Sequence, residues 1–326
     1  MAELHAAGLT TYQISLARKC CLKRVRRGVY VVALSCPNPE HELLSRLASS
    51  SITDLPMEQG GLRKKREEHR ILVRSFVGAL PPNSMFSHMS ALIVHGLPVP
   101  YFQQNVPLRV ETIHPRHSVR STTMLIRQRV CLDTDSAVVD GIPVTSLLRT
   151  LWDIGRDYPL PFSVAVGDAA IHNRLTTTEE LASYCDSHPA RTHQNRIDLM
   201  REHIDGRRES IGESICAIRF VEYAITGFEP QVEFFNEYGD VEARPDFTHK
   251  KAKVIAEFDG EGKYYLSGDD PKRAFERERR REYRLRNRGY TVFRIRWADL
   301  FSADLFLRIK ACVERNLAEG PSRRRG

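Results

Sequence analysis

A regular alternation of helical and β-type segments in the last third of this 326-residue chain constrains its fold most strongly. The segments follow one another as a helix at 210–223, strands at 232–238, 244–248 and 254–259, a charged helix at 271–288, a strand at 291–297 and a helix at 304–318. Apolar residues recur at helical spacing in the helices and alternate in the last strand. This αβββαβα order predicts an α/β sheet with flanking helices.

The N-terminal segment has a different pattern. Residues 11–20 have helical spacing, and Thr10 or Thr11 can cap a helix there. Two short β-type runs then flank Arg26-Arg27-Gly28, where glycine suits a turn that needs positive φ. A helix, a turn, a second helix and a basic hairpin are typical of a winged helix. We therefore predict four parts: a winged-helix-like DNA-binding segment at 1–35, an α/β middle region at 36–200, the α/β domain at 207–312 and a basic tail at 313–326.

The charge balance favours anionic partners, nucleic acid first, because 49 Lys and Arg face 41 Asp and Glu, for a formal net charge of +8. The residues that we expect to contact DNA are the hairpin arginines Arg24, Arg26 and Arg27, and Lys272, Arg273, Arg277, Arg280 and Arg284 of the charged helix. Arg294 and Arg296 add charge on the next strand. The alternative for such a helix is an ordinary solvated face.

The cysteine content and the hydropathy of the chain indicate the cellular compartment in which we expect the protein. The seven cysteines are an odd number without a Cys-x-x-Cys pair, which predicts neither a zinc ribbon nor a disulfide framework. No apolar run approaches the roughly 18–20 residues that span a bilayer. The first residues lack the basic and apolar regions of a signal peptide. We expect a cytoplasmic protein with no membrane partner.

Three carboxylates are predicted to gather on the C-terminal sheet. A tight turn around Lys251-Ala252 would give cross-strand partners whose numbers sum to 503, which places Asp246 opposite Glu257. Asp259 lies two residues further along the strand and projects from the same face. Like charges directly opposite one another are destabilising, so this cluster favours a bound cation. Mg²⁺, or Mn²⁺ in its place, is the expected cofactor, with Asp246, Glu257 and Asp259 as ligands.

Two further residues complete the predicted centre. Lys263 follows closely enough to hold the attacking water or to offset phosphate charge. Glu213, in the helix at 210–223, could reach the rim of the sheet as another ligand. Each residue also has an ordinary alternative: an exposed strand position for Asp246, a β-turn for Asp259-Gly260, a solvated helix face for Glu213 and a surface lysine for Lys263.

Residues 207–312 resemble the Vsr-like branch of the PD-(D/E)XK nuclease superfamily. The matching residues are Glu213 in Gly212-Glu213-Ser214, Pro245-Asp246-Phe247, Glu257-Phe258-Asp259-Gly260, Lys263-Tyr264 and Gly289-Tyr290 through Arg296-Trp297. The resemblance implies a restriction-endonuclease-like αβββαβ domain, a metal-dependent DNA endonuclease fold, and Asp246 as a metal ligand. The superfamily usually has lysine two residues after the glutamate, and Asp259 occupies that position here.

Residues 1–35 and the middle region are similar to AbiEi-type antitoxins. The residues concerned are Ala7-Gly8-Leu9-Thr10 with Gln13-Ile14, Arg26-Arg27-Gly28-Val29-Tyr30, Ser90-Ala91 with His95-Gly96-Leu97, and Gly141 through Ser146 with Arg149-Thr150. The resemblance implies a DNA-binding winged helix that represses its own operon.

Together these features predict a DNA-binding protein with a Mg²⁺-dependent endonuclease-like domain that hydrolyses phosphodiester bonds, in a defence or toxin-antitoxin context. The chief alternative is a non-catalytic, antitoxin-like repressor whose nuclease-like fold only binds DNA or a partner. A purely protein-binding module is a third hypothesis. The sequence leaves open a cognate toxin or other protein partner, and the oligomeric state.

Overall fold

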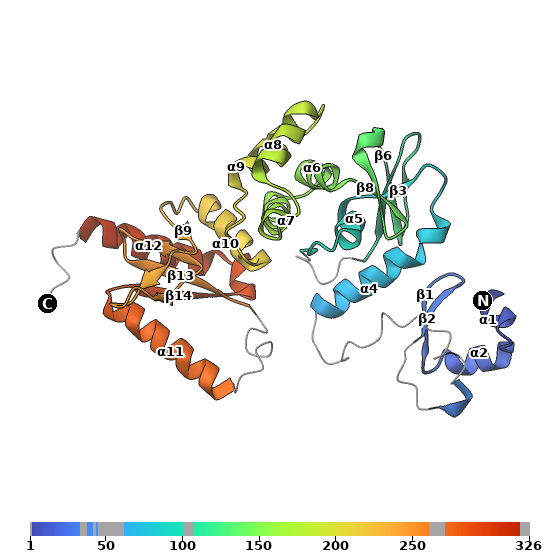
Figure 1. Ribbon diagram of the computed structural model, residues 1–326, viewed down its shortest axis with the longest axis horizontal. Coiled ribbons are helices and arrows are strands. Elements are labelled where there is room, and N and C mark those ends of the chain that lie inside the picture. The colour runs from blue at the N-terminus through green and yellow to red at the C-terminus, as the bar shows by residue number, and fades with distance from the viewer. Residues whose placement is uncertain are drawn as a thin grey trace. The chain divides into compact units, whose positions relative to one another are not determined.

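A computed structural model describes residues 2–32, 38–41, 44, 62–100, 107–260 and 271–319. The chain divides into two compact units, Met1–Asp153 and Ile154–Gly326. Both units combine helices with β-sheet (Figure 1), so the expected α/β class is confirmed.

Two short helices and a hairpin form the start of the first unit. They are α1 (Ala2–Ala6), α2 (Thr11–Ala17), β1 (Leu22–Arg26) and β2 (Val29–Val32). Thr10 caps α2 in a capping box with Gln13, and Gly28 turns the hairpin with a φ of +79°. Leu9, Ile14, Ala17, Cys21, Leu22 and Leu44 make a small core beneath them. The expected helix and basic hairpin are therefore present.

A six-stranded mixed sheet forms the rest of the first unit. Its strands are β3 (Met85–Phe86), β4 (Val110–His114), β5 (Val119–Arg120), β6 (Met124–Gln128), β7 (Ser136–Val139) and β8 (Ile142–Thr145), in the order β5-β6-β4-β3-β8-β7. Helices α4 (Leu62–Ser75) and α5 (His88–Val94) pack against it. Their residues Leu72, Val73 and Ala91 share one apolar core with Phe86, Val110 and Val144.

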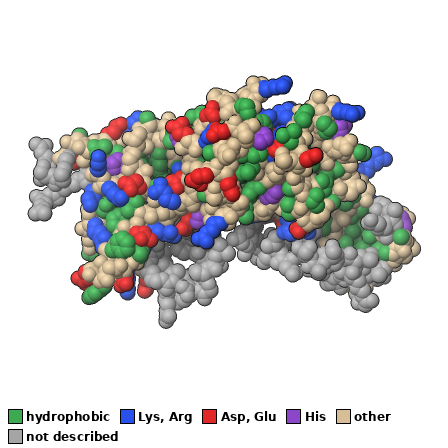
Figure 2. Space-filling view, turned by 45° about the horizontal axis from the view of Figure 1, so that its top comes forward, with side chains coloured by type: hydrophobic (Ala, Val, Ile, Leu, Met, Phe, Trp, Pro, Cys, Tyr) green, Lys and Arg blue, Asp and Glu red, His purple; other side chains and the backbone are tan. Residues whose placement is uncertain are grey.

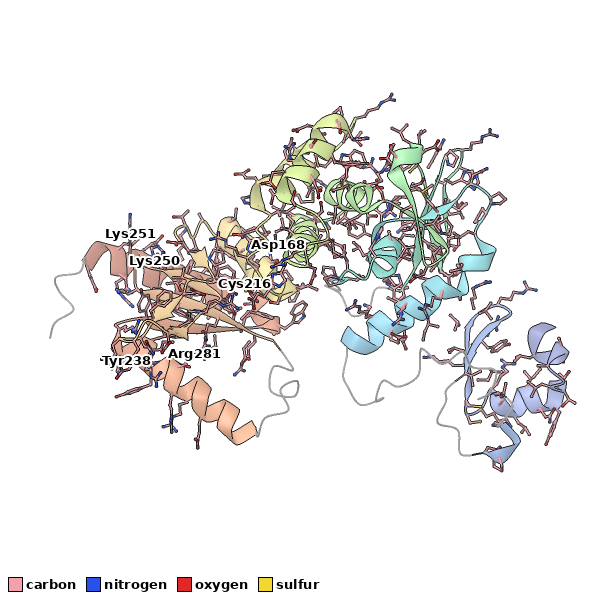
Figure 3. The ribbon with its side chains drawn as sticks, in the orientation of Figure 1. Asp168, Cys216, Tyr238, Lys250, Lys251 and Arg281 are labelled. Carbon is pink, nitrogen blue, oxygen red and sulfur yellow. The ribbon has the colours of Figure 1, made fainter. Side chains whose placement is uncertain are left out.

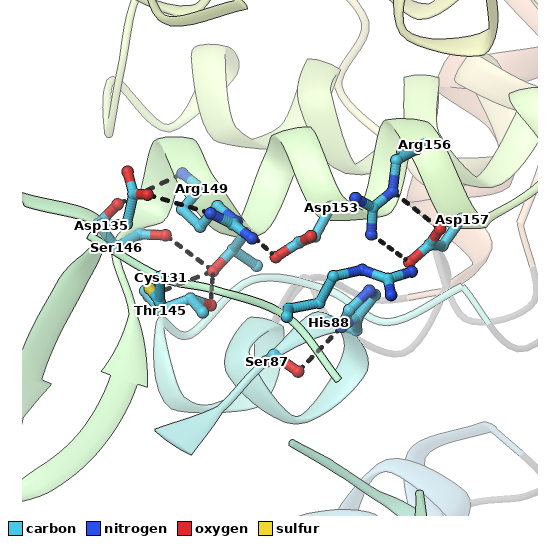
Figure 4. Close-up of polar contacts among 12 residues, drawn as sticks. Ser87, His88, Cys131, Asp135, Thr145, Ser146, Arg149, Asp153, Arg156 and Asp157 are labelled. Carbon is cyan, nitrogen blue, oxygen red and sulfur yellow. Dashed lines mark hydrogen bonds and ion pairs between the residues drawn. The ribbon is translucent and has the colours of Figure 1, made fainter. Parts of the chain in front are cut away.

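A buried ion cluster fixes the start of α6 (Leu147–Asp157) in this unit (Figure 4). Arg149 donates from Nη1 to Asp135 at 3.0 Å and from Nε to Asp153 at 2.9 Å. The exposed fractions of the three side chains are 8%, 2% and 0%. The guanidinium also lies 5.0 Å from the centre of the Trp152 ring. A charge held this deep needs both partners, so the cluster is structural.

Helices dominate the first part of the second unit: α7 (Leu160–His172), α8 (Thr178–Ser187), α9 (Gln194–His203) and α10 (Ile211–Glu222). α7 packs against α9 and α10. Gly167 allows close packing, because a Cβ there would lie 2.4 Å from Ile204 Cδ1. Asp168 of α7 accepts from Asp205 N at 2.6 Å and from Arg208 Nη1 at 2.8 Å, which ties α7 to the turn before α10.

A four-stranded sheet of order β14-β13-β12-β9 follows. Its strands are β9 (Glu229–Pro230), β12 (Phe247–His249), β13 (Val254–Asp259) and β14 (Thr291–Arg296). α11 (Pro271–Asn287) connects β13 to β14, which pair in parallel. η5 (Trp297–Phe301) and α12 (Ala303–Glu319) complete the unit, and β10 (Phe234–Phe235) pairs with β11 (Val241–Ala243) in a separate hairpin.

Two of the expected strands are shorter than the sequence indicated. The run at 232–238 keeps only Phe234–Phe235, because the Asn236 side chain accepts from the backbone N–H groups of Tyr238 and Asp240 and starts a turn. The run at 244–248 is replaced by β11 and β12, with Pro245 between them. Proline has no N–H to donate to a ladder, so the strand is interrupted there.

Helices cover both faces of the four-stranded sheet (Figure 1). On the α11 face, Ile255 packs with Leu285 and Tyr290 in one core. On the other face, Phe247 meets Phe220 of α10 edge to face, with ring centres 5.2 Å apart. Asp246 directly precedes β12, and Glu257 and Asp259 lie on β13.

Candidate functional site

The β12–β13 hairpin has the register that the sequence predicts. Phe247 pairs with Ala256, Thr248 with Ile255 and His249 with Val254, so each pair of numbers sums to 503. Lys253 takes a φ of +55° in the turn. Asp246 directly precedes this ladder, and its carboxylate oxygen Oδ2 accepts from Phe258 N at 2.7 Å. Asp246 is therefore fixed at the side of β13 next to Glu257.

Glu213 lies in the first turn of α10, buried to 3% exposure. It accepts from Ser210 Oγ at 2.7 Å, Glu209 N at 3.0 Å and Gln231 Nε2 at 3.0 Å. Gln231 also donates its backbone N–H to the carbonyl of Asp246 at 3.0 Å. Gln231 thus links Glu213 to Asp246. The prediction of a solvated helix face for Glu213, which was the alternative, is wrong.

A glycine brings α10 close to the acidic strand. A Cβ on Gly212 would lie 2.1 Å from Cε1 of the buried Phe258 ring. Only a residue without a side chain therefore lets the start of α10 approach β13 this closely. The backbone N–H of the same Phe258 holds Asp246. The position of Glu213 and that of Asp246 both depend on this contact.

Glu257 is held between two arginines. Its Oε1 lies 2.7 Å from Arg281 Nη2 on α11, and its Oε2 lies 2.9 Å from Arg294 Nη1 on β14. The Glu257 side chain is 5% exposed, while those of Arg281 and Arg294 are 26% and 32% exposed. Arg294 also contacts Glu282 at 3.0 Å. Glu257 thus lies below two guanidinium groups that solvent reaches.

The remaining predicted residues are Asp259 and Lys263, and the structure describes only Asp259. Asp259 ends β13, opposite Arg296 of β14 in the parallel ladder, and is partly exposed. It shares a strand face with Glu257, as the period of two requires. Lys263 lies outside the described residues.

Cys216 adds a neutral group beneath the carboxylates. It is fully buried on α10 in the interior of the second unit (Figure 3). Burial raises the pKa of its thiol well above the usual value, and the charges of Asp246 and Glu213 raise it further. Cys216 is therefore a protonated thiol that lacks the thiolate character of a nucleophile.

The donor set agrees with Mg²⁺ in kind, because carboxylate oxygens are the ligands that this ion prefers. In the described parts of the chain, however, no group of three His, Cys, Asp or Glu with ligand atoms within 4.8 Å of one another includes Asp246, Glu257 or Asp259. Glu257 would have to leave at least one arginine to bind an ion together with Asp246. The positive charge that the sequence predicts beside Glu257 is supplied in this structure by the guanidinium groups of Arg281 and Arg294.

The basic residues expected to contact DNA have different surroundings. Arg24, Arg27 and Arg280 are exposed. Arg26 donates to the carbonyl of Ser75 from Nε at 3.0 Å and from Nη2 at 2.5 Å, and it stacks over Phe76. Arg284 pairs with Glu242 at 3.1 Å. The side chains of Lys272, Arg273 and Arg277 lie outside the described part of the chain. On the face seen in Figure 2, basic and acidic side chains are interspersed.

Sequence reasoning missed the residues that organise this centre. The sequence counts Arg281 among the basic residues of the helix at 271–288 that would hold the phosphate backbone, and it does not single out Gln231 or Cys216. The helical pattern of 271–288 carries no apolar stripe strong enough to show which arginines face the sheet. The one usable signal is the register, which places Glu257 beside Asp246 on the strand that precedes a highly basic helix.

Comparison with protein-family models, curated proteins and solved structures found no match to this chain. Within the part of the chain that the structure describes, no helix combines the length and apolar character that crossing a membrane requires.

Proposed function

We propose that this protein binds DNA and that its second unit carries a nuclease-type centre, which hydrolyses phosphodiester bonds with Mg²⁺ or Mn²⁺. The observation that carries the proposal is the hairpin that fixes Asp246 on the backbone of Phe258, next to Glu257. Gln231 connects Glu213 to Asp246 through one hydrogen bond to each residue. The succession of α10, the antiparallel β12–β13 pair, α11 and the parallel strand β14 supports a restriction-endonuclease-like domain.

In this proposal Asp246 and Glu257 hold the ion, with Asp259 or Glu213 as a further ligand. A bound ion of this kind lowers the pKa of water and stabilises charge on a phosphodiester. Glu257 must first separate from Arg281 or Arg294. The released guanidinium would then face the entering phosphate, for which its planar donors are well suited.

DNA contact is proposed for the exposed arginines of both units. Arg24 lies on β1 and Arg27 lies in the turn of the β1–β2 hairpin, while Arg280 lies on α11 one residue from Arg281. Phosphate contacts release counterions, so the affinity for DNA should fall steeply as salt increases. A flat salt dependence would contradict this part of the proposal and would favour a protein-binding module.

The deciding experiment is cleavage of supercoiled plasmid and of single-stranded DNA with Mg²⁺ or Mn²⁺ against EDTA. The variants are Asp246→Ala and Glu257→Gln, and the matched control is Glu237→Gln, an exposed carboxylate in the same unit. We expect metal-dependent nicking by the wild type and the control, and its loss in both variants. Nicking that Asp246→Ala leaves unchanged would place the activity elsewhere or in a contaminant.

The second candidate function is a non-catalytic, antitoxin-like repressor. The pairing of Glu257 with Arg281 and Arg294 favours it, because two guanidinium groups already neutralise the carboxylate that an ion would need. In this case the protein binds DNA in a salt-sensitive manner and cleaves neither substrate in either metal. The same plasmid assay, run beside a binding titration, separates the two functions.

A further inference from the structure

Two adjacent cysteines and a histidine meet in the N-terminal segment of the first unit, far from the acidic centre in sequence. Cys20 and Cys21 follow the end of α2, and His41 ends the short helix η1 (Pro39–His41). The Nδ1 atom of His41 lies 3.2 Å from Cys20 Sγ and 3.5 Å from Cys21 Sγ, and the two sulfur atoms are 3.8 Å apart. All three ligand atoms therefore converge on one point.

The backbone after α2 explains how neighbouring side chains can point the same way. Lys19 N and Cys20 N donate to the carbonyls of Leu16 and Ala17, so the helix tightens into a turn before β1 begins at Leu22. In an extended strand, residues next to each other would point to opposite sides. The turn removes this constraint. Cys20 remains exposed, whereas Cys21 and His41 are buried at 2% and 4% exposure.

The distances match a tetrahedral metal centre. Zn²⁺ binds sulfur at about 2.3 Å and imidazole nitrogen at about 2.0–2.1 Å, so two ligands at the tetrahedral angle lie about 3.8 Å apart for two sulfurs and about 3.6 Å for sulfur and nitrogen. The observed separations fall within a few tenths of an ångström of these values. An imidazole nitrogen has one lone pair, so a single thiol hydrogen bond would place only one sulfur beside it.

We propose that Cys20, Cys21 and His41 form a binding site for a thiophilic divalent cation, with Zn²⁺ the best match. Two thiolates and a neutral imidazole balance the charge of the ion, and soft sulfur ligands select such metals over Mg²⁺. Each thiol releases its proton on binding. The three residues leave the fourth tetrahedral position to water or to another ligand.

The site joins the end of α2 and the start of β1 to η1, beside the core of Leu9, Ile14, Leu22 and Leu44. A core of this size stabilises a fold weakly, and small domains of this kind often depend on a metal. The bound ion would fix the base of the hairpin that presents Arg24 and Arg27. Metal loading would therefore stabilise the N-terminal segment without acting on the second unit.

The test uses the full-length protein, reduced, stripped with a chelator and titrated with Co²⁺ and then Zn²⁺. Absorption from cobalt–thiolate charge transfer reports sulfur ligands alone, so ions bound by carboxylates do not contribute. We expect one equivalent of Zn²⁺ to displace the Co²⁺ signal. Cys20→Ser and His41→Gln should each lower the affinity at least tenfold. Cys20 is exposed, so its substitution leaves the core in place if Cys21→Ser fails to fold.

Two controls show that the signal belongs to this site. Cys131→Ser should bind metal as the wild type does, because burial raises the pKa of Cys131 to about 11 and makes it a poor thiolate ligand. Asp246→Ala should also leave the cobalt–thiolate absorption unchanged. Unchanged affinity in both Cys20→Ser and His41→Gln, or no absorption in the reduced wild type, would overturn the proposal. So would reduced protein that binds no metal while mass spectrometry of the oxidised protein finds a Cys20–Cys21 disulfide.

Discussion

Two arginine–carboxylate clusters, one in each unit, have opposite compositions. In the first unit, Arg149 lies between Asp135 and Asp153, and all three side chains are at most 8% exposed. In the second unit, Glu257 lies between Arg281 and Arg294, whose side chains are 26% and 32% exposed. One arginine neutralises two acids in the first case, and two arginines surround one acid in the second.

The difference separates a structural cluster from one that can exchange partners. Breaking a buried pair leaves a charge with no access to water, at a high cost in stability. A guanidinium that is partly exposed can move into solvent at a small cost. The Glu257 cluster therefore combines a buried carboxylate with replaceable cations, which is the arrangement that ligand exchange requires.

Arg149→Met should lower the free energy of unfolding of the first unit by about 3–5 kcal/mol, because it removes the guanidinium group that pairs with the buried carboxylates of Asp135 and Asp153. Arg294→Met should lower that of the second unit by about 1 kcal/mol or less, because Arg281 remains on Glu257. Urea titrations followed by tryptophan fluorescence measure both values. The chain has two tryptophans, so Trp297→Phe leaves Trp152 to report the first unit, and Trp152→Phe leaves Trp297 to report the second. Equal losses in the two units would remove the contrast.

Gly212→Ala should destabilise the second unit by roughly 1–3 kcal/mol, because the new methyl group overlaps the ring of Phe258. Movement of Phe258 also displaces the N–H group that holds Asp246. Metal-dependent cleavage should therefore fall by more than the loss of folded protein explains. Gly78→Ala in the first unit is the control for glycine replacement, because a Cβ at Gly78 would meet nothing within 4 Å and its φ is not positive. Wild-type stability of Gly212→Ala would mean that α10 can shift freely against β13.

The ion pair between Asp168 and Arg208 gives a test of burial by pH, because burial changes the pKa of the carboxyl group. Burial raises the pKa of Asp168 to about 6, against the opposing effect of Arg208. Between about pH 4 and pH 6 the folded state keeps a proton on Asp168 that the unfolded state has lost. The free energy of unfolding of the second unit should therefore fall as the pH rises through this range. Relative to Asp168→Asn, the fall should be roughly 1–3 kcal/mol. Urea titrations at several pH values measure it, and parallel curves for the two proteins would contradict the assignment.

The smallest expected effect concerns the ion at the acidic centre. Arg294→Met should raise the affinity for Mn²⁺ about tenfold, because Glu257 then loses one competing cation and its charge is less neutralised. Isothermal titration calorimetry measures the affinity, and Arg286→Met, which removes an exposed arginine on α11 that pairs with Glu282, is the control. A lower Mn²⁺ affinity in Arg294→Met would show that the arginines support the ion and do not compete with it.

Much of the second unit could be predicted from the sequence because its strongest signals are local. The helix at 271–287, the strands at 254–259 and 291–296 and the hairpin register all follow from patterns within about 20 residues. The Asp246–Glu257 neighbourhood came from the same local reasoning. Pro245 and the turn-forming Asn236 were visible as well, and their effect on strand length was underestimated.

The partners of the carboxylates could not be predicted because they depend on long-range packing. Arg281 reaches Glu257 from a helix whose exposed and buried sides are both rich in arginine, so composition does not show which residue turns inward. His41 follows the adjacent residues Cys20 and Cys21 by about 20 positions, and this spacing matches no standard pattern of metal ligands. Their meeting follows from the turn after α2 and the position of η1.

The contact between Arg26 and Ser75 has a consequence for the order in which the first unit folds. The two residues are 49 positions apart, so the hairpin gains its anchor only after a long loop has closed. Loop closure is costly in entropy, and contacts across such a loop form late. The hairpin should therefore be the first part of the unit to open and the last to form, and amide hydrogen exchange should be faster in β1 and β2 than in β4 and β6.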